Sequence, residues 1–157
     1  MEKNGSCSLP VEFKGTFSHA CVVVDDIEKA VDSYQKLLGC ERPRIKMTGA
    51  PEDARVQYRG EPTNARAIQA FVQMDSLRIE LLQPDGNPST WRDFLDRNGN
   101  SFHHIAYDVP DMDAALELFA SYGAPLLQMG YYNGGVYAYI DSERTFGVML
   151  ELLMSTR

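Results

Sequence analysis

The sequence contains few cysteines and no long hydrophobic run. Its cysteines, Cys7, Cys21 and Cys40, are odd in number and lack the paired spacing of a zinc-cysteine site, which argues against a disulfide scaffold. No stretch of about 18 apolar residues occurs, so no transmembrane helix is expected. The first 15 residues are polar and lack the apolar segment of a secretory signal. We therefore expect a cytoplasmic protein.

Positive charge is also scarce. Fifteen Lys and Arg residues face 22 Asp and Glu residues, a net charge of −7, which disfavours a nucleic-acid partner because phosphates need a positive surface. The 157 residues and the 44% hydrophobic content are typical of one globular domain. We expect a small-molecule substrate, with neither nucleic acid nor membrane as a partner.

The chain contains an internal repeat. The segment that starts at Phe17 aligns with the segment that starts at Phe102, at a constant offset that superposes His19 on His104. Each copy begins with an apolar, β-rich stretch, continues into an amphipathic helical pattern, and ends that pattern at a glycine. Each copy also closes with a similar strand pattern, which superposes Glu80 on Glu151.

The two halves therefore predict an α+β fold built from two βαβββ modules. The extra length of the first module is rich in Pro, Gly and charge and is expected to be a loop. The expected boundaries are an N-terminal arm at 1–15, module one at about 16–84 with its loop at 41–66, a linker helix at about 88–99, module two at about 101–154, and a single domain over 16–157.

Four residues of the repeat predict a metal site. His19 and His104 occupy the same position in the two first strands, and Glu80 and Glu151 occupy the same position in the two last strands, among apolar neighbours. A carboxylate inside a buried strand is costly unless it is paired or binds a metal. A single strand histidine is more commonly structural, and a single strand glutamate commonly faces solvent. The occurrence of both types in both repeats favours a shared ion.

The ligand types restrict the chemistry. Two imidazoles and two carboxylates neutralise a divalent cation, and such mixed ligation suits Zn, Ni, Co, Mn or Fe. Catalysis would need open coordination positions, at which the ion acts as a Lewis acid on a substrate that chelates through two oxygens. His103 neighbours His104 on the same strand, so it is expected to face the opposite way and to have a structural or supporting role.

Two further features concern the substrate. The 41–66 loop holds six basic and four acidic residues, which indicates either an anion-binding segment or a solvated loop. Tyr137 and Tyr139, with Tyr131 and Tyr132, surround a Gly-rich turn, and these tyrosines either contact the substrate or simply build strands.

In these features the chain resembles the vicinal oxygen chelate superfamily, which includes glyoxalases, extradiol dioxygenases and bleomycin resistance proteins. The resemblance covers residues 16–154 and rests on Phe17-Ser-His19, Asp25-Asp-Ile27, Leu37-Leu-Gly39, Ile79-Glu80-Leu-Leu-Gln-Pro84, Phe102-His-His104-Ile-Ala and Met149-Leu-Glu151-Leu. It implies an eight-stranded, cup-shaped mixed sheet, a homodimer, and one divalent metal ion held by His19, Glu80, His104 and Glu151.

Within the superfamily, the linker resembles that of the methylmalonyl-CoA epimerase subgroup. This implies a proton-transfer isomerase or lyase that acts through a metal-chelated enolate on an acyl-CoA or another thiol conjugate. Two positions differ from that subgroup: Gln69 aligns with a glutamate base on the third strand of the first module, and Glu80 replaces a glutamine. Gln69 is therefore expected to be a substrate-binding residue. An amide cannot accept a proton, so Glu80 or Glu151 is the expected base, as in a glyoxalase I-like lactoylglutathione lyase, which is the alternative. A dioxygenase and a small-molecule-binding resistance protein are less favoured.

Overall fold

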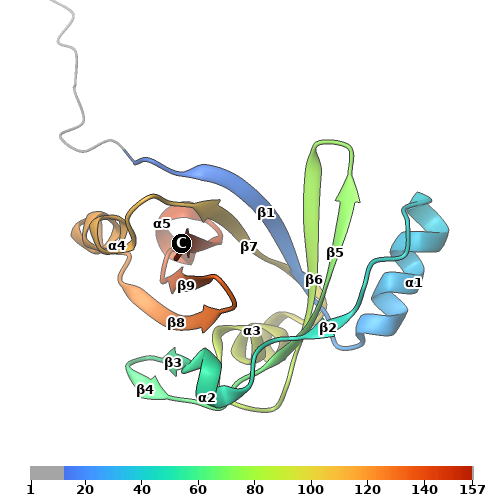
Figure 1. Cartoon of the computed structure of the whole chain (residues 1–157), viewed down its shortest axis with the longest axis horizontal. Helices are drawn as coiled ribbons and strands as arrows, with labels where there is room; N and C mark the ends of the chain where they lie inside the picture. The colour runs from blue at the N-terminus through green and yellow to red at the C-terminus, as the bar shows by residue number, and fades with distance from the viewer. Residues whose placement is uncertain (1–12, 157) are drawn as a thin grey trace, which may run out of the picture.

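The computed structural model describes residues 13–156, and Figure 1 shows their arrangement. The first half contains β1 (Thr16–Val23), α1 (Ile27–Leu38), β2 (Lys46–Met47), α2 (Pro51–Ala54), β3 (Gln57–Tyr58), β4 (Glu61–Pro62), β5 (Ala67–Met74) and β6 (Leu77–Pro84). The helix α3 (Thr90–Asn98) follows. The second half contains β7 (Ser101–Asp108), α4 (Met112–Ser121), β8 (Leu126–Tyr132), β9 (Gly135–Ile140), α5 (Glu143–Phe146) and β10 (Met149–Ser155). Residues 1–12 of the expected arm lie outside the described residues.

All described strands belong to one mixed sheet in the order β2-β5-β6-β1-β7-β10-β9-β8-β3-β4. The two halves meet where β1 pairs antiparallel with β7, and the sheet curls around on both sides of this pair (Figure 1). The predicted α+β class and the cup-like mixed sheet are confirmed. The predicted number of eight strands is wrong, because the described part of the sheet has ten.

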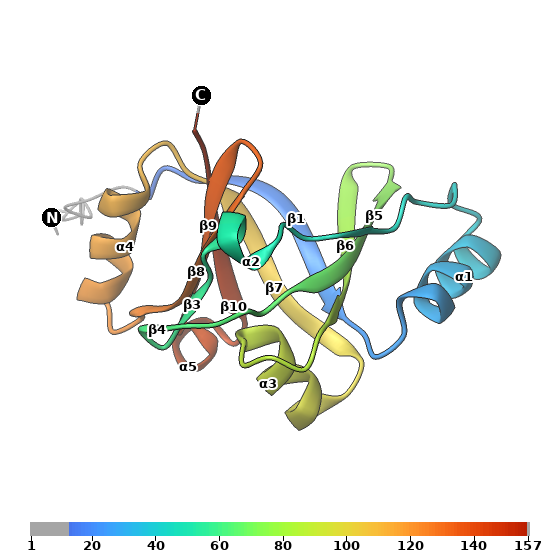
Figure 2. The same cartoon turned by 60° about the horizontal axis from the view of Figure 1, so that its bottom comes forward.

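The additional strands come from the segment that was expected to be a loop. In residues 41–66, β2 pairs with β5 at one end of the sheet, whereas β3 and β4 extend the other end beside β8. Figure 2 shows α2 and its flanking segments running between these two ends. Tyr58 Oη donates a hydrogen bond of 2.5 Å to Asp93 on α3 and so fixes the segment to the linker helix. Strands of two residues are too short to produce a periodic hydrophobic pattern, which explains the wrong prediction.

The two halves also begin their helices in the same way. Asp26 caps α1 by accepting a hydrogen bond from the Lys29 amide, and Asp111 caps α4 by accepting one from the Ala114 amide. Such a cap contributes about 1 kcal/mol to helix stability. α1 packs against β5 and β6, and α4 packs against β10, so these helices cover the outer side of the sheet at opposite ends (Figure 1).

The helix α3 packs on the inner side of the sheet. Its residues Trp91, Phe94 and Leu95 form one apolar cluster with residues of both halves, namely Cys21, Val23, Ala65, Ala67, Leu82, Tyr137, Tyr139 and Met149. Both figures place α3 at one end of the curled sheet. It therefore closes that end of the cup. None of the helices in residues 13–156 is long and apolar enough to cross a membrane.

Candidate metal centre

The register of the central strands places the four predicted ligands on the inner side of the cup. In the first half Cys21 on β1 lies opposite Glu80 on β6, and in the second half Ala106 on β7 lies opposite Glu151 on β10. Since Cys21 and Ala106 are equivalent in the repeat, both halves pair their first and last strands in the same register. Each glutamate thereby lies on the outer flank of the β1–β7 pair.

Two β-bulges turn the histidines toward each other. The β1–β7 pairing shifts register once on β1, between Phe17 and His19, and once on β7, between Phe102 and His104. Ser18 and His103 are the residues that have no partner in the opposite strand. Ser18 and His103 are equivalent in the repeat. A bulge interrupts the alternation of side chains, so two neighbouring residues lie close together on one side of the strand.

The prediction that His103 faces away from His104 is therefore wrong. The Nδ1 atoms of these two rings lie 2.7 Å apart, within hydrogen-bond distance. In the first half, Ser18 Oγ lies 3.2 Å from His19 Nδ1 in the same relationship. Both bulged residues contact the Nδ1 atom of the following histidine and leave its Nε2 atom free to bind an ion. No periodic sequence pattern predicts a bulge. Because Ser18 and His103 are equivalent in the repeat, however, a bulge found in one half indicates the same bulge in the other half.

The ligand atoms form a compact group. The Nε2 atoms of His19 and His104 lie 3.4 Å apart. Oε2 of Glu80 lies 3.3 Å and 3.5 Å from these nitrogens, and Oε2 of Glu151 lies 3.3 Å and 3.1 Å from them. Metal-ligand bonds of about 2.1 Å would place neighbouring ligand atoms about 3.0 to 3.4 Å apart. The observed distances fit a single ion held by all four residues.

Burial of the two glutamates favours a positive charge at this position. The four residues are 0% to 5% exposed, and among the described residues no Lys or Arg forms an ion pair with either glutamate. Apart from these two imidazole nitrogens, Oε2 of Glu151 is buried without a hydrogen-bond partner in the described part of the chain. Two buried carboxylates without a counter-ion would be strongly destabilising. The set thus fits a divalent metal ion, which it would neutralise.

Burial and the charges of the centre also shift the pKa values of His19, His103 and Glu151. Burial opposes protonation of His19, but hydrogen bonds to Glu151 and Glu80 outweigh it and raise the pKa of His19 to about 9. Burial also opposes ionisation of Glu151, whereas His104 and His19 outweigh it and lower the pKa of that carboxyl well below its usual range. Burial and the neighbouring His104 lower the pKa of His103, so its ring is neutral. The centre therefore favours positive charge between the two glutamates.

The predicted substrate-binding residues take different positions. Gln69 lies on β5, and its amide donates a hydrogen bond of 2.5 Å to Oε1 of Glu80. Tyr139 is 1% exposed, and its ring centroid lies 5.0 Å from that of His104. Tyr137 is 9% exposed and packs near Trp91. These side chains surround the ligands, and their contact with a substrate stays a prediction.

Two residues near the ligands were not singled out by the sequence pattern. Phe71 on β5 lies opposite Glu80, and its ring centroid is 5.4 Å from that of His19. Cys21 on β1 is fully buried and lies close to His103 and His104. Burial raises the pKa of its thiol, which favours the protonated form.

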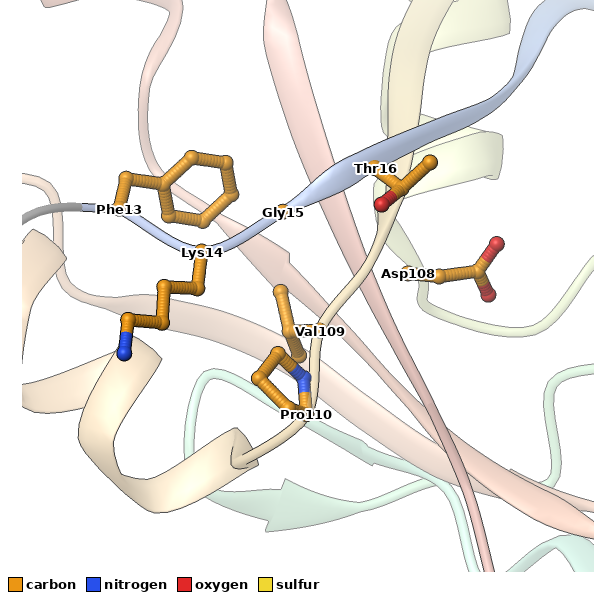
Figure 3. Close-up of a pocket in the computed structure, with 7 residues that line it drawn as sticks. All are labelled: Phe13, Lys14, Gly15, Thr16, Asp108, Val109 and Pro110. Carbon is orange, nitrogen blue, oxygen red and sulfur yellow. The ribbon is translucent and has the colours of Figure 1, made fainter.

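A separate surface hollow lies at the start of β1. Phe13, Lys14, Gly15, Thr16, Asp108, Val109 and Pro110 line it (Figure 3). None of these residues belongs to the ligand set. The ring of Phe13 packs edge-on against Tyr107 and Phe119, which fixes this part of the chain to the second half.

A cup-shaped mixed sheet with a two-histidine, two-carboxylate centre between two repeats defines a class of protein. The chain belongs to the glyoxalase/bleomycin resistance protein/dioxygenase superfamily, whose model matches residues 18–139. Over 117 residues it is 33% identical to the ethylmalonyl-CoA/methylmalonyl-CoA epimerase of Cereibacter sphaeroides, an alignment that covers 74% of this chain and 77% of that protein. It is 29% identical to the mitochondrial methylmalonyl-CoA epimerase of Mus musculus over 69% of this chain and 54% of that protein.

Solved structures share the fold. The methylmalonyl-CoA epimerase of Mycobacterium tuberculosis superposes with a TM-score of 0.59 at 22% identity, covering 90% of this chain and 88% of that one. A methylmalonyl-CoA epimerase in complex with methylmalonyl-CoA and ammonium superposes with a TM-score of 0.57 at 21% identity, covering 90% of this chain and 95% of that one. The relatives named as epimerases are isomerases, so this chain is related to enzymes of that type.

Proposed function

We propose that the protein is a metal-dependent epimerase that inverts the carbon next to the carbonyl group of a short branched acyl thioester, with a coenzyme A conjugate as substrate. The observation that carries the proposal is the compact group of His19, Glu80, His104 and Glu151, contributed equally by the two repeats. The 33% identity to the Cereibacter epimerase supports the choice of reaction. A divalent ion bound by these residues would supply Lewis acidity to the carbonyl oxygen.

The chain itself would move the proton. Epimerisation removes a proton from one side of a carbon and returns one to the other side. The strand order β6-β1-β7-β10 places Glu80 and Glu151 on opposite flanks of the histidine pair, so a carboxylate is available on either side. Gln69 holds Oε1 of Glu80 in place, whereas no side chain outside the four ligands hydrogen-bonds the Glu151 carboxylate within the described chain. Glu151 is therefore the freer of the two bases.

A glyoxalase I-like lactoylglutathione lyase is the second candidate. The observation that favours it is that an amide, Gln69, occupies the expected base position and contacts a ligand carboxylate, Glu80. Proton transfer then depends on the ligand glutamates, which is the arrangement expected of that lyase. Both candidates share the same first step, loss of a proton next to a carbonyl.

Hydrogen exchange with solvent separates these reactions. Metal-loaded protein should incorporate deuterium at the α-carbon of 2-methylmalonyl-CoA in deuterated water, and Glu151→Gln should slow this exchange by at least about 100-fold. Methylglyoxal with glutathione, assayed in parallel, tests the lyase. Product formation from this pair without exchange into the acyl thioester would reject the epimerase in favour of the lyase. The expected homodimer is tested by sedimentation velocity on the same preparation.

A further inference from the structure

The inner wall of the cup is covered unequally by α3 in the two halves. In the second half Tyr137 and Tyr139 pack against Trp91 of α3, with ring centroids 6.0 Å and 5.9 Å apart. Their equivalents in the register of the first half are Gln69 and Phe71, which do not belong to the apolar cluster around α3. Phe71 is half-buried. The wall that contains Phe71 is therefore less covered than the wall that contains Tyr137 and Tyr139.

Two cations flank Phe71 on this wall. Lys46 Nζ lies 5.7 Å and the Arg78 guanidinium carbon lies 4.1 Å from the centroid of its ring. Arg78 precedes Glu80 by two residues on β6, so both side chains project to the inner face. Because the same ring also contacts His19, Phe71 connects the cation pair to the metal centre.

The strand pairing confirms that Lys46 belongs to the same face. Lys46 on β2 lies directly opposite Gln69 on β5, and the Gln69 amide bonds Glu80. Residues that lie opposite each other in neighbouring strands project to the same side of a sheet. Lys46 therefore lies on the inner wall, one strand beyond the residue that holds a metal ligand.

Within residues 13–156, neither Lys46 nor Arg78 forms an ion pair with a carboxylate. In the described part of the protein no carboxylate lies within 4.0 Å of Lys46 or Arg78, although the chain has a net charge of −7. By contrast, Arg42 on the outer surface pairs with two acidic residues. In the register of the second half, Gly130 occupies the position of Lys46 and Met149 occupies the position of Arg78. The repeat thus shares its metal ligands but not these cations.

We propose that Lys46 and Arg78 bind an anionic group of the substrate, a carboxylate or a phosphate, on the part of the molecule that the metal ion does not hold. That this anion belongs to an acyl thioester rests on the proposed function. Arg and Lys form charge-assisted hydrogen bonds with both groups. The face of Phe71 attracts both cations and so restrains them beside the ring that contacts His19.

Binding of unreactive probes tests the site without catalysis. The probes are coenzyme A, which supplies phosphates, and methylmalonate, which supplies carboxylates, measured by calorimetry on cobalt-loaded protein. The test variant is Lys46→Ala/Arg78→Ala. The control is Lys14→Ala/Arg144→Ala, which removes the same charges from two exposed residues outside this wall. We expect the test variant to weaken binding of at least one probe by about 10-fold or more, and the control by less than about 2-fold.

The pattern of losses identifies the anion. Weaker binding of coenzyme A alone assigns a phosphate, and weaker binding of methylmalonate alone assigns a carboxylate. Equal affinities of the test variant and the control for both probes would overturn the proposal, as would failure of the wild type to bind either probe at millimolar concentration. If binding depends on the two cations but no deuterium enters 2-methylmalonyl-CoA, the anion site stands and the proposed reaction falls.

Discussion

The Nδ1 atoms of His103 and His104 lie 2.7 Å apart because a β-bulge places both rings on one side of β7. An ion bound at Nε2 of His104 would leave its ring proton on Nδ1, from which it can be donated to the neutral His103 ring. Partners of this kind fix the tautomer and orientation of a metal-binding histidine. Ser18 has the same position relative to His19 in the other repeat.

Substitution of His103 should therefore weaken metal binding without abolishing it. We expect His103→Phe to raise the dissociation constant for cobalt by about 10- to 100-fold, since the buried ring volume is kept but the hydrogen bond is lost. His103→Gln, which retains an acceptor, should recover part of the affinity and of the visible cobalt spectrum. Competition with a chromophoric chelator measures both. Wild-type affinity in His103→Phe would show that the ring only fills space.

Loss of a ligand should have a larger effect. Wild-type protein is expected to contain about one divalent ion per chain, and His104→Ala or Glu151→Ala should lose most of it. Glu117→Ala is the matched control, because it removes an exposed carboxylate from α4. Elemental analysis after dialysis gives the result, and metal removal by a chelator should also lower the thermal midpoint of the wild type. Equal metal content in all four proteins would refute the ligand assignment.

Gln69 is expected to stabilise the centre through Glu80. Gln69→Leu removes the donor to a buried carboxylate oxygen, which should lower the free energy of unfolding by about 1 to 3 kcal/mol while metal is retained. Gln73→Leu, on the same strand but with its amide bonded to the exposed Asp75 carbonyl, should change it by less than about 0.5 kcal/mol. Urea unfolding of the metal-loaded proteins provides the comparison. Identical effects of the two substitutions would contradict the assigned role.

The shifted pKa of Tyr58 is expected to make the free energy of unfolding depend on pH. Burial and the bond to Asp93 raise the pKa of Tyr58 to about 12, above the value of about 10 expected in the unfolded chain. The folded state therefore favours neutral Tyr58, and this stabilisation is complete below pH 10 and is lost as the pH rises through 12. Tyr58→Phe should be about 1 kcal/mol less stable at pH 8 and should lose less stability between pH 10 and 12 than the wild type.

Urea unfolding at several pH values measures this difference. Tyr122→Phe serves as the control because Tyr122 is 58% exposed. If Tyr58→Phe and the wild type lose stability in parallel above pH 10, the Tyr58–Asp93 bond does not hold the 41–66 segment in the way the distance suggests.

The repeated sequence was sufficient to predict the two modules and to select the four residues that the structure brings together. A repeat constrains pairs of positions at once: the offset that aligns His19 with His104 also aligns Asp26 with Asp111, the two helix caps. Strands and helices of eight or more residues carry their own hydrophobic periods, so their existence could be read directly.

Tertiary structure alone decided the rest. The two bulges, the short strands of residues 41–66 and the position of α3 depend on pairing between distant segments, which leaves no local period in the sequence. The packing of α3 also makes the inner walls of the two halves different. Because α3 covers Tyr137 and Tyr139 but not Phe71, the two walls are buried unequally, and the less buried wall carries Lys46 and Arg78.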